Sequence, residues 1–315
     1  MTIRELFILI LPVFAVIAVG VALRRLRWIE EVSEPSLIRL VVNVCMPCLV
    51  FDTIVGNPAL RTPGNLLVPP MAGFLTTVAG FAVAYFAAKR IGLGDAREVR
   101  TFALTAGVCN YSYLPFPILG GLWGAHAQGV MLVHNMGVDT ALWSVGMLVL
   151  TGASPLAGWR RLVTPMLASL FVSVAIDTAG VSEYVPGLVR SLAHALGVCA
   201  VPVGLVMTGA SLADYLDHPI ELLHRNVAIA ACVVRLLVMP ALMLCLARGL
   251  PCSVELKRVL VVEAAMPAAV IPIILARYYG GQPLTSVQVV LATTCVGIFA
   301  SPLWIRAGLA WVGVS

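Results

Sequence analysis

The chain has 315 residues, of which 60% are hydrophobic and only 11% are charged. Soluble domains carry about 45–50% apolar and about 25% charged residues, so this composition belongs to a protein embedded in lipid. It excludes a cytoplasmic enzyme, a nucleic-acid-binding protein and a secreted disulfide-rich module. The net charge of +5 at pH 7 is modest and indicates topology, not a site for polyanions.

Ten apolar runs, separated by charged residues or by proline and glycine, predict an all-α integral membrane protein with ten transmembrane helices. A span needs about 20 apolar residues, so the remaining chain is too short for a sizeable soluble domain. The predicted spans cover residues 5–24, 35–55, 66–88, 99–119, 127–150, 162–180, 191–212, 226–247, 257–279 and 285–309.

The first apolar run is a span and not a signal peptide, because it is long, ends in Arg24 and Arg25 and contains no clear cleavage site. Most of the eight cysteines lie inside apolar stretches, where free cysteine behaves as a small hydrophobic residue. The pair Cys45 and Cys48 has no further ligands at usable spacing. We therefore expect no metal and no cofactor.

The distribution of lysine and arginine predicts how the chain crosses the cell membrane. Connections after odd-numbered spans carry eleven of these residues and the opposite side carries seven. Lysine and arginine concentrate in cytoplasmic loops, and an even number of spans leaves both ends on one side. The chain is therefore expected in the cell (cytoplasmic) membrane with both termini outside.

The two halves of the chain repeat one pattern. The fourth span is interrupted by Pro115 and the ninth by Pro267, at matching places in each group of five spans. Five spans per half means that the second copy enters from the opposite side, as in the inverted repeats of transporters. We predict a first repeat over residues 1–155 and an inverted second repeat over residues 156–315.

The interrupted spans are where a substrate site is expected. Proline unwinds a helix, and unwound backbone in a bilayer must lie inside the protein or along a wet cavity. Each half-helix N-terminus presents free N–H groups and partial positive charge, which suits an anion. A structural proline kink without ligand is the alternative. The predicted substrate-binding residues around the two breaks are Asn110, Tyr111, Ser112, Pro115, Met266 and Pro267.

Two carboxylates inside predicted spans are candidates for binding a proton or a coupling ion, since charge in a bilayer is costly and usually functional. Glu263 lies one turn before Pro267 on the same helical face, so it either binds a proton or cation or packs against a neighbouring helix. Asp139 shares a face with Asn135, a further predicted substrate-binding residue, and the two would extend a polar path beside the fourth span. His134 points away from that face and is expected to be a packed or interfacial histidine.

One buried cation is also predicted. Arg235 lies deep in the eighth span. It either attracts an anionic substrate or forms an ion pair with Glu263 or Asp139.

Several motifs, taken in order, resemble the auxin efflux carrier family, which includes plant PIN proteins and bacterial malate and malonate carriers. The similar stretches are Asn43-Val-Cys-Met-Pro47, Asn110-Tyr-Ser-Tyr-Leu-Pro-Phe-Pro117, Gly209-Ala-Ser-Leu212, Glu263-Ala-Ala-Met-Pro267 and Pro302-Leu-Trp304. The resemblance implies a fold like that of the sodium/bile-acid carriers. Spans 1, 2, 6 and 7 would form a scaffold, and spans 3–5 and 8–10 would form a mobile transport unit. It also implies substrate at the crossing of spans four and nine, and a homodimer formed through the scaffold.

The resemblance assigns the polar ligand at the crossing to Asn110. Asn43, in the second span, is a further predicted substrate-binding residue. The sequence departs from the family at Ser112 and Pro115, which stand where glycines are usual. Met266-Pro267-Ala268 replaces the Gln-Asn pair that follows a similar glutamate in sodium/bile-acid carriers. This favours coupling to protons or membrane potential over coupling to sodium.

The function predicted from these features is secondary active transport of small organic anions, carboxylates such as malonate or malate, by alternating access. The alternatives are an exporter of auxin-like aromatic acids, a sodium-coupled symporter, and a receptor or channel on the same fold. An enzyme is not expected, because the chain lacks metal-binding or nucleophile motifs such as H-E-x-x-H, and no Walker run suggests ATP-driven pumping. The expected partners are the organic anion and the lipid bilayer, and no nucleic acid.

Overall fold

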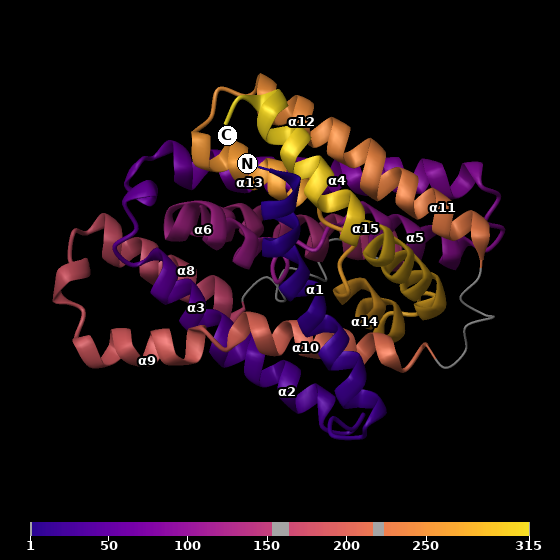
Figure 1. The fold of residues 1–315 in the computed structure, drawn as a ribbon, viewed down its shortest axis with the longest axis horizontal. Helices are drawn as coiled ribbons and strands as arrows, with labels where there is room; N and C mark the ends of the chain where they lie inside the picture. The colour runs from indigo at the N-terminus through magenta and orange to yellow at the C-terminus, as the bar shows by residue number, and fades with distance from the viewer. Residues whose placement is uncertain (1, 153–163, 217–223, 315) are drawn as a thin grey trace.

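A computed structural model describes residues 2–152, 164–216 and 224–314, which fold as a bundle of helices (Figure 1). Seven helices in these ranges are long and apolar enough to cross a membrane. They are α1 (Ile3–Arg25), α2 to α3 (Glu34–Leu40 and Met46–Ile54, joined by a π-helical turn), α4 (Gly64–Arg90), α6 to α7 (Pro115–Ala141 and Met147–Thr151, likewise joined), α9 to α10 (Gly187–Gly197 and Ala200–Ala213), α11 to α12 (Arg225–Val233 and Met239–Gly249) and α15 (Pro283–Val312).

Four α-helices of the described chain are shorter. They are α5 (Ala96–Gly107), α8 (Pro165–Thr178), α13 (Val254–Ala264) and α14 (Ile271–Tyr278). Polar side chains cap the first turns of three of them, because Asp95, Thr164 and Ser253 accept hydrogen bonds from backbone N–H groups that have no helical partner. These caps fix where each short helix begins.

Two of the predicted spans are broken in the structure, and one predicted connection between spans is a kink within a helix. The fourth and ninth predicted spans are broken, into α5 and the start of α6 and into α13 and α14. The boundary between the fourth and fifth spans is a kink at Gly124, whose φ of 68° and ψ of −161° interrupt α6. The predicted repeat boundary at residue 155 and the start of the sixth span lie outside the described residues.

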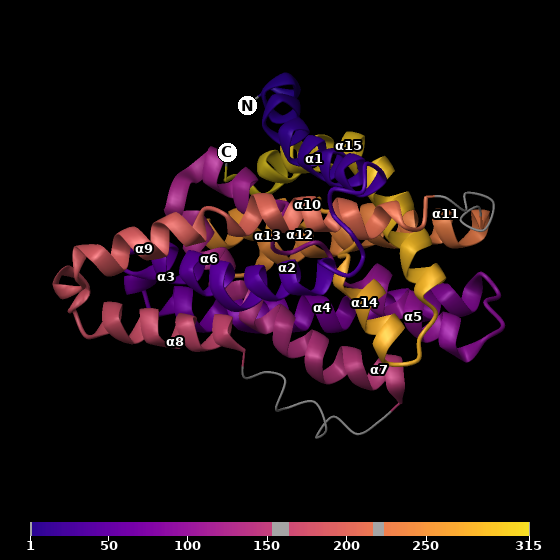
Figure 2. The same cartoon turned by 90° about the horizontal axis from the view of Figure 1, so that it is seen from below.

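Most of the strongest helix contacts fall into two groups, which are connected where α1 packs against α15 and α6 and where α3 packs against α6. In the first, α1 packs along α10, and α3 packs against α8 and α9. In the second, α4 packs against α5 and α6, α13 against α6 and α12, and α15 against α11 and α5. Figure 2 shows α8 and α9 extending together to one side of the bundle, away from α5 and α11.

Glycines allow the closest of these approaches. A Cβ atom on Gly209 would stand 1.9 Å from the carbonyl oxygen of Ile17, and one on Gly137 would stand 1.8 Å from that of Pro70. Small residues let membrane helices pack by van der Waals contact, where the hydrophobic effect provides no driving force. Alanine at either position would require the backbones to separate.

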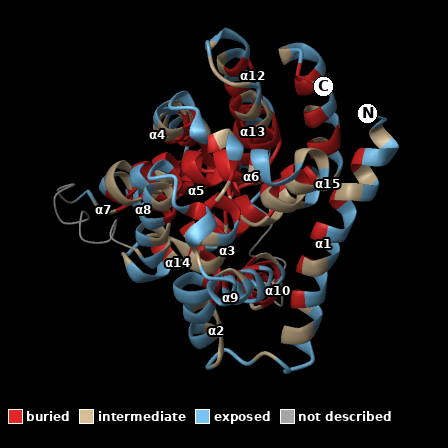
Figure 3. Ribbon diagram, turned by 90° about the vertical axis from the view of Figure 1, so that its left-hand side faces the viewer, coloured by how far each residue is buried: buried red, intermediate tan, exposed pale blue. Residues whose placement is uncertain are grey.

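Burial is concentrated in the second group. Figure 3 shows the buried residues gathered on α5, α6 and α13, with exposed residues on α2 and α9. Much of the exposed surface is apolar, including Phe86 and Leu188, as expected for helices that face lipid. The two ends of the chain lie close together in Figures 1 and 3.

Candidate functional site

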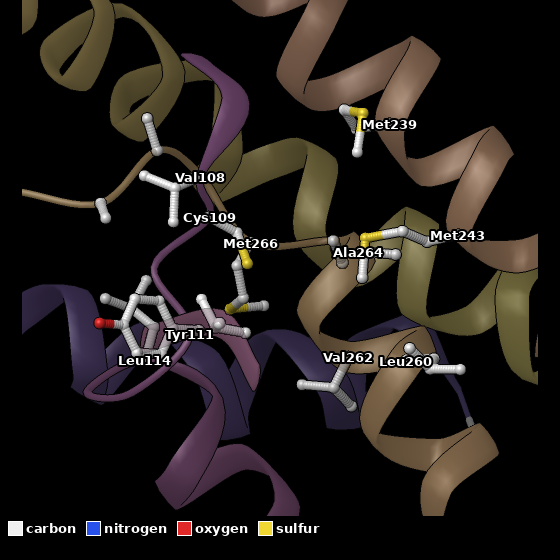
Figure 4. Close-up of a cluster of buried hydrophobic side chains, with 14 of the residues drawn as sticks. Val108, Cys109, Tyr111, Leu114, Met239, Met243, Leu260, Val262, Ala264 and Met266 are labelled. Carbon is white, nitrogen blue, oxygen red and sulfur yellow. The ribbon is translucent and has the colours of Figure 1, made fainter. Parts of the chain in front are cut away.

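The two broken helices meet at their breaks. The backbone N–H of Asn110 donates a 2.8 Å hydrogen bond to the carbonyl oxygen of Pro267, and the N–H of Ala269 donates a 3.1 Å bond to Val108. Cys109 and Ala268 thereby form an antiparallel bridge between the unwound segments. Figure 4 shows the two segments passing each other at Cys109 and Met266. Each break satisfies polar backbone groups of the other, as a bilayer interior demands.

Side chains from neighbouring helices hold the crossover in place. Thr293 of α15 accepts a 3.1 Å hydrogen bond from the N–H of Ala268, and Ser301 of the same helix donates one of 2.7 Å to the carbonyl of Ala265. On the other segment, the Asn135 amide donates a 2.9 Å bond to the carbonyl of Tyr111. These buried bonds fix the shape of the crossover.

A cavity of about 210 Å³ opens beside the crossover, between it and the first helix group. Its wall on the crossover side comes from residues 110–113 and 269–271, and α3, α8 and α10 close the opposite side with Met46, Met166 and Thr208. The remaining wall residues are Val42, Met136, Asp139, Thr140, Trp143, Thr164, Leu167 and Leu170. Since the wall joins both helix groups, any movement between them would change the cavity.

Two half-helices begin at this cavity. α6 starts at Pro115, just after the wall residues Ser112 and Tyr113, and α14 starts at the wall residue Ile271. Within the described chain, the backbone N–H groups of Ser112 and Tyr113 donate to no protein acceptor. Helix N-termini carry partial positive charge and free donors, so the two starts together favour a negatively charged group.

Asn110 is positioned at the N-terminus of α6. Its Oδ1 atom accepts a 3.4 Å hydrogen bond from the N–H of Leu114, and its own N–H is held by Pro267. The side-chain Nδ2 has no protein acceptor among the described residues. An amide donor held in this way on the cavity wall is suited to bind a ligand oxygen.

Asp139 is the one ionisable acid or base other than tyrosine on the described wall of the cavity. Its Oδ1 accepts a 2.6 Å hydrogen bond from the hydroxyl of Tyr111. The neighbouring Tyr113 packs on α10, where a Cβ atom on Gly204 would stand 2.3 Å from its ring. The crossover thus contacts the first helix group directly through an aromatic side chain seated on a glycine.

A second group of ionisable side chains lies behind the crossover. The Nδ1 atom of His134 lies 3.3 Å from Oε2 of Glu263, and the Cys109 thiol lies 4.0 Å from the same oxygen. Arg235 and Glu263 line a separate cavity of about 10 Å³. The side chains of His134, Arg235 and Glu263 are all buried, at 0%, 1% and 0% exposure.

The structure divides the predicted site residues into four sets. Asn110, Tyr111, Ser112 and Asp139 line the larger cavity. Pro115, Met266, Pro267 and Asn135 are buried and shape the crossover without lining the cavity. Glu263 and Arg235 line the small cavity behind it. Asn43 is exposed and belongs to neither wall.

Several wall residues were not predicted. Trp143, Met166 and Thr208 come from helices far apart in the chain, and no motif or spacing marks them. His134 was expected to be packed or interfacial and is fully buried, but its contact with Glu263 was not predicted. Both omissions concern how helices rotate against one another, which a helical period in one segment does not specify.

Comparisons with known proteins agree with this architecture. The profile of the family described as "Membrane transport protein" matches residues 5–155 and 153–305. A protein of Methanothermobacter thermautotrophicus, named an uncharacterized transporter, is 25% identical over 94% of this chain and 96% of its own. A second uncharacterized transporter, from Methanocaldococcus jannaschii, is 22% identical over the same shares. The chain is therefore a multi-pass membrane protein that belongs to the auxin efflux carrier family of membrane transport proteins.

Proposed function

We propose that this protein is a secondary carrier of small organic anions, which it binds in the cavity at the crossover. The observation that carries the proposal is the arrangement of two half-helix N-termini, with free N–H groups of Ser112 and Tyr113, at one cavity wall. A carboxylate would be bound there by backbone donors and by the amide of Asn110. No basic side chain is needed, and none lines the described wall.

Transport would proceed by alternating access. The first helix group (α1 to α3 and α8 to α10) would serve as the scaffold, and the remaining helices would form the transport unit that carries the crossover. The cavity lies between these groups, which contact each other where α1 packs against α15 and α6 and where α3 packs against α6. We further propose ten crossings as two inverted repeats, 1–155 and 156–315, with both termini outside and a homodimer through the scaffold.

Asp139 is the proton site in this proposal. An ionised carboxylate within the cavity would repel an anionic substrate, and the repulsion is strong where water is excluded. A protonated Asp139 removes that repulsion and keeps its hydrogen bond to Tyr111. Substrate and proton would therefore bind together, which couples anion transport to the proton gradient. Glu263 is the less suitable candidate because it lies outside the substrate cavity.

The apolar part of the cavity wall favours a second candidate within this class. The wall contains three aromatic residues, Trp143, Tyr111 and Tyr113. It also contains the apolar residues Met136, Met166, Leu167 and Leu170. Such a wall would desolvate malonate or malate at a cost, whereas it would stabilise the ring of an aromatic acid through apolar burial and stacking. An auxin-like aromatic acid is therefore the alternative substrate, and a receptor or channel would bind it without accumulating it.

The proposal is tested by uptake of labelled malonate and labelled indole-3-acetate into proteoliposomes with an imposed pH gradient. Wild type is compared with Asn110→Ala and with Asn226→Ala, a control on an exposed asparagine at the start of α11. Saturable uptake of either acid that Asn110→Ala removes and Asn226→Ala retains would support a carboxylate carrier. Binding without uptake would favour a receptor, and equal uptake in all three proteins would remove the site from the crossover.

A further inference from the structure

The buried group behind the crossover has an unusual charge arrangement. Arg235, Glu263 and His134 are fully buried and come from three different segments, the π-helical turn Val234–Val238, α13 and α6. A charged side chain is retained in a membrane interior when it is paired or functional. Arg235 does not line the larger cavity, so substrate binding there does not explain why this charge is buried.

The small cavity shared by Arg235 and Glu263 lies where two helices end. Its other wall residues include Gly107, the last residue of α5, and Cys109, and Glu263 itself lies in the last turn of α13. Helix C-termini carry partial negative charge. Two C-termini and one carboxylate thus converge on a cavity of about 10 Å³, close to the size of a single water molecule. Such a place is electrostatically suited to a cation.

Arg235 provides that cation from the chain itself. Its Nη2 atom donates a hydrogen bond of 3.7 Å to the Met243 sulfur, and its Nε donates to no acceptor in the described residues. The Oε1 atom of Glu263 likewise has no hydrogen-bond partner there. The guanidinium and the carboxylate face one cavity without a direct ion pair, so Arg235 acts on this region through its charge more than through a specific hydrogen bond.

We propose that the guanidinium of Arg235 occupies a monovalent-cation position behind the crossover, where it permanently neutralises Glu263 and the C-termini of α5 and α13. The carrier therefore needs no dissolved sodium or potassium ion at this position. Removing the side chain while keeping Glu263 creates a site that binds guanidinium or a small alkali cation. The expectation that transport needs no dissolved sodium or potassium ion rests on the proposed carrier function. The expectation that the variant binds a cation does not.

The titratable groups nearby fit this assignment. His134 and Cys109 face Glu263 from α6 and from the crossover, and α4 contributes the uncharged Thr76 and Thr77. The formal charges of Arg235 and Glu263 are opposite and equal. Loss of Arg235 would leave Glu263 as an uncompensated buried charge, which is strongly destabilising unless a cation replaces it.

The experiment measures the melting temperature of purified protein in guanidinium, sodium, potassium or choline chloride at equal, low millimolar ionic strength. The melting temperature of wild type should be the same in all four salts, and so should that of Arg235→Lys. Arg235→Ala should melt at a lower temperature in choline and rise saturably, by about 3 °C or more, with guanidinium or sodium. The double variant Arg235→Ala/Glu263→Gln should show no cation-dependent rise, because the carboxylate that attracts the cation is absent.

Three results would overturn the inference. The first is an Arg235→Ala protein that responds to none of the cations. The second is a wild type that sodium stabilises specifically. The third applies if Arg235→Ala yields no folded protein. The double variant should then restore folding, and its failure to do so would mean that Arg235 acts by packing. Uptake by wild type should proceed at the same rate in sodium, potassium and choline, and absence of any uptake would bear on the proposed function alone.

Discussion

The backbone N–H of Asn110 lies 2.8 Å from the carbonyl oxygen of Pro267, which joins the break of one helix to the break of another 157 positions later in the chain. This bond and the one from Ala269 to Val108 make the two unwound segments a single short antiparallel pair. The half-helices α6 and α14 therefore begin next to one another, at the wall of one cavity. The proposed anion site is a direct consequence of this pairing.

Replacement of the Asn110 side chain should separate its two roles. Asn110→Ala removes the ligand amide and the acceptor for the N–H of Leu114, so we expect substrate affinity to fall at least about tenfold, the equivalent of one hydrogen bond to a charged group. Asn110→Asp keeps the acceptor but adds a negative charge, and it should reject anions still more strongly. Both are measured by ligand binding to purified protein. Wild-type affinity in Asn110→Asp would contradict an anion site.

Protonation of Asp139 should set the pH dependence of transport. Uptake should fall as the pH on the substrate side rises, because ionised Asp139 repels the carboxylate. Asp139→Asn is permanently neutral, so it should bind substrate equally well at all pH values and lose accumulation driven by the proton gradient. The measurement is uptake and binding across a pH range in which the substrate's own charge is constant. An unchanged pH profile in Asp139→Asn, with a changed one in Glu263→Gln, would transfer the role to Glu263.

The hydroxyl of Thr293 should stabilise the crossover. It accepts the hydrogen bond of the Ala268 N–H in a fully buried place. Thr293→Val keeps the shape and leaves that N–H unpaired, which should cost about 1–3 kcal/mol of stability. Thr178→Val, at an exposed threonine of α8, is the matched control. Equal melting temperatures for the two variants would show that the crossover does not depend on this bond.

The contact between α1 and α10 should be intolerant of any added side chain. A Cβ atom on Gly209 would lie 1.9 Å from the carbonyl oxygen of Ile17, so Gly209→Ala should separate the two helices and cost about 1–3 kcal/mol. Gly64→Ala, at the start of α4, meets no atom within 4 Å and serves as control. Thermal unfolding in detergent measures both. A Gly209→Ala protein as stable as the control would contradict this packing.

The broad architecture was predictable because it depends on composition and on residues with strong backbone effects. Long apolar runs gave the spanning helices, and Pro115 and Pro267 marked the two breaks, since proline cannot continue the helical hydrogen bonds. Residues 120–126 were predicted to connect the fourth and fifth spans, whereas α6 is helical on both sides of a kink at Gly124, because a single glycine with positive φ is enough to redirect the chain there.

The composition of the site was predictable only in part. Asn110, Tyr111, Ser112 and Asp139 were named from the broken span and its neighbour, and all four line the cavity. The sequence did not separate Asp139 from Glu263, because both are acids in spans, and only the packing of α13 behind the crossover distinguishes them. The far wall, including Met166 and Thr208, depends on tertiary contacts between distant segments that local patterns do not contain.

The central claim is that the crossover cavity binds a carboxylate and carries it across the membrane with a proton. The most direct test is uptake of labelled malonate and indole-3-acetate into proteoliposomes under an imposed pH gradient, with wild type, Asn110→Ala and Asn226→Ala measured together. The account predicts saturable, gradient-driven uptake of at least one acid in wild type and Asn226→Ala, and its loss in Asn110→Ala. Uptake that is equal in all three proteins, or that is indifferent to the pH gradient, would contradict it.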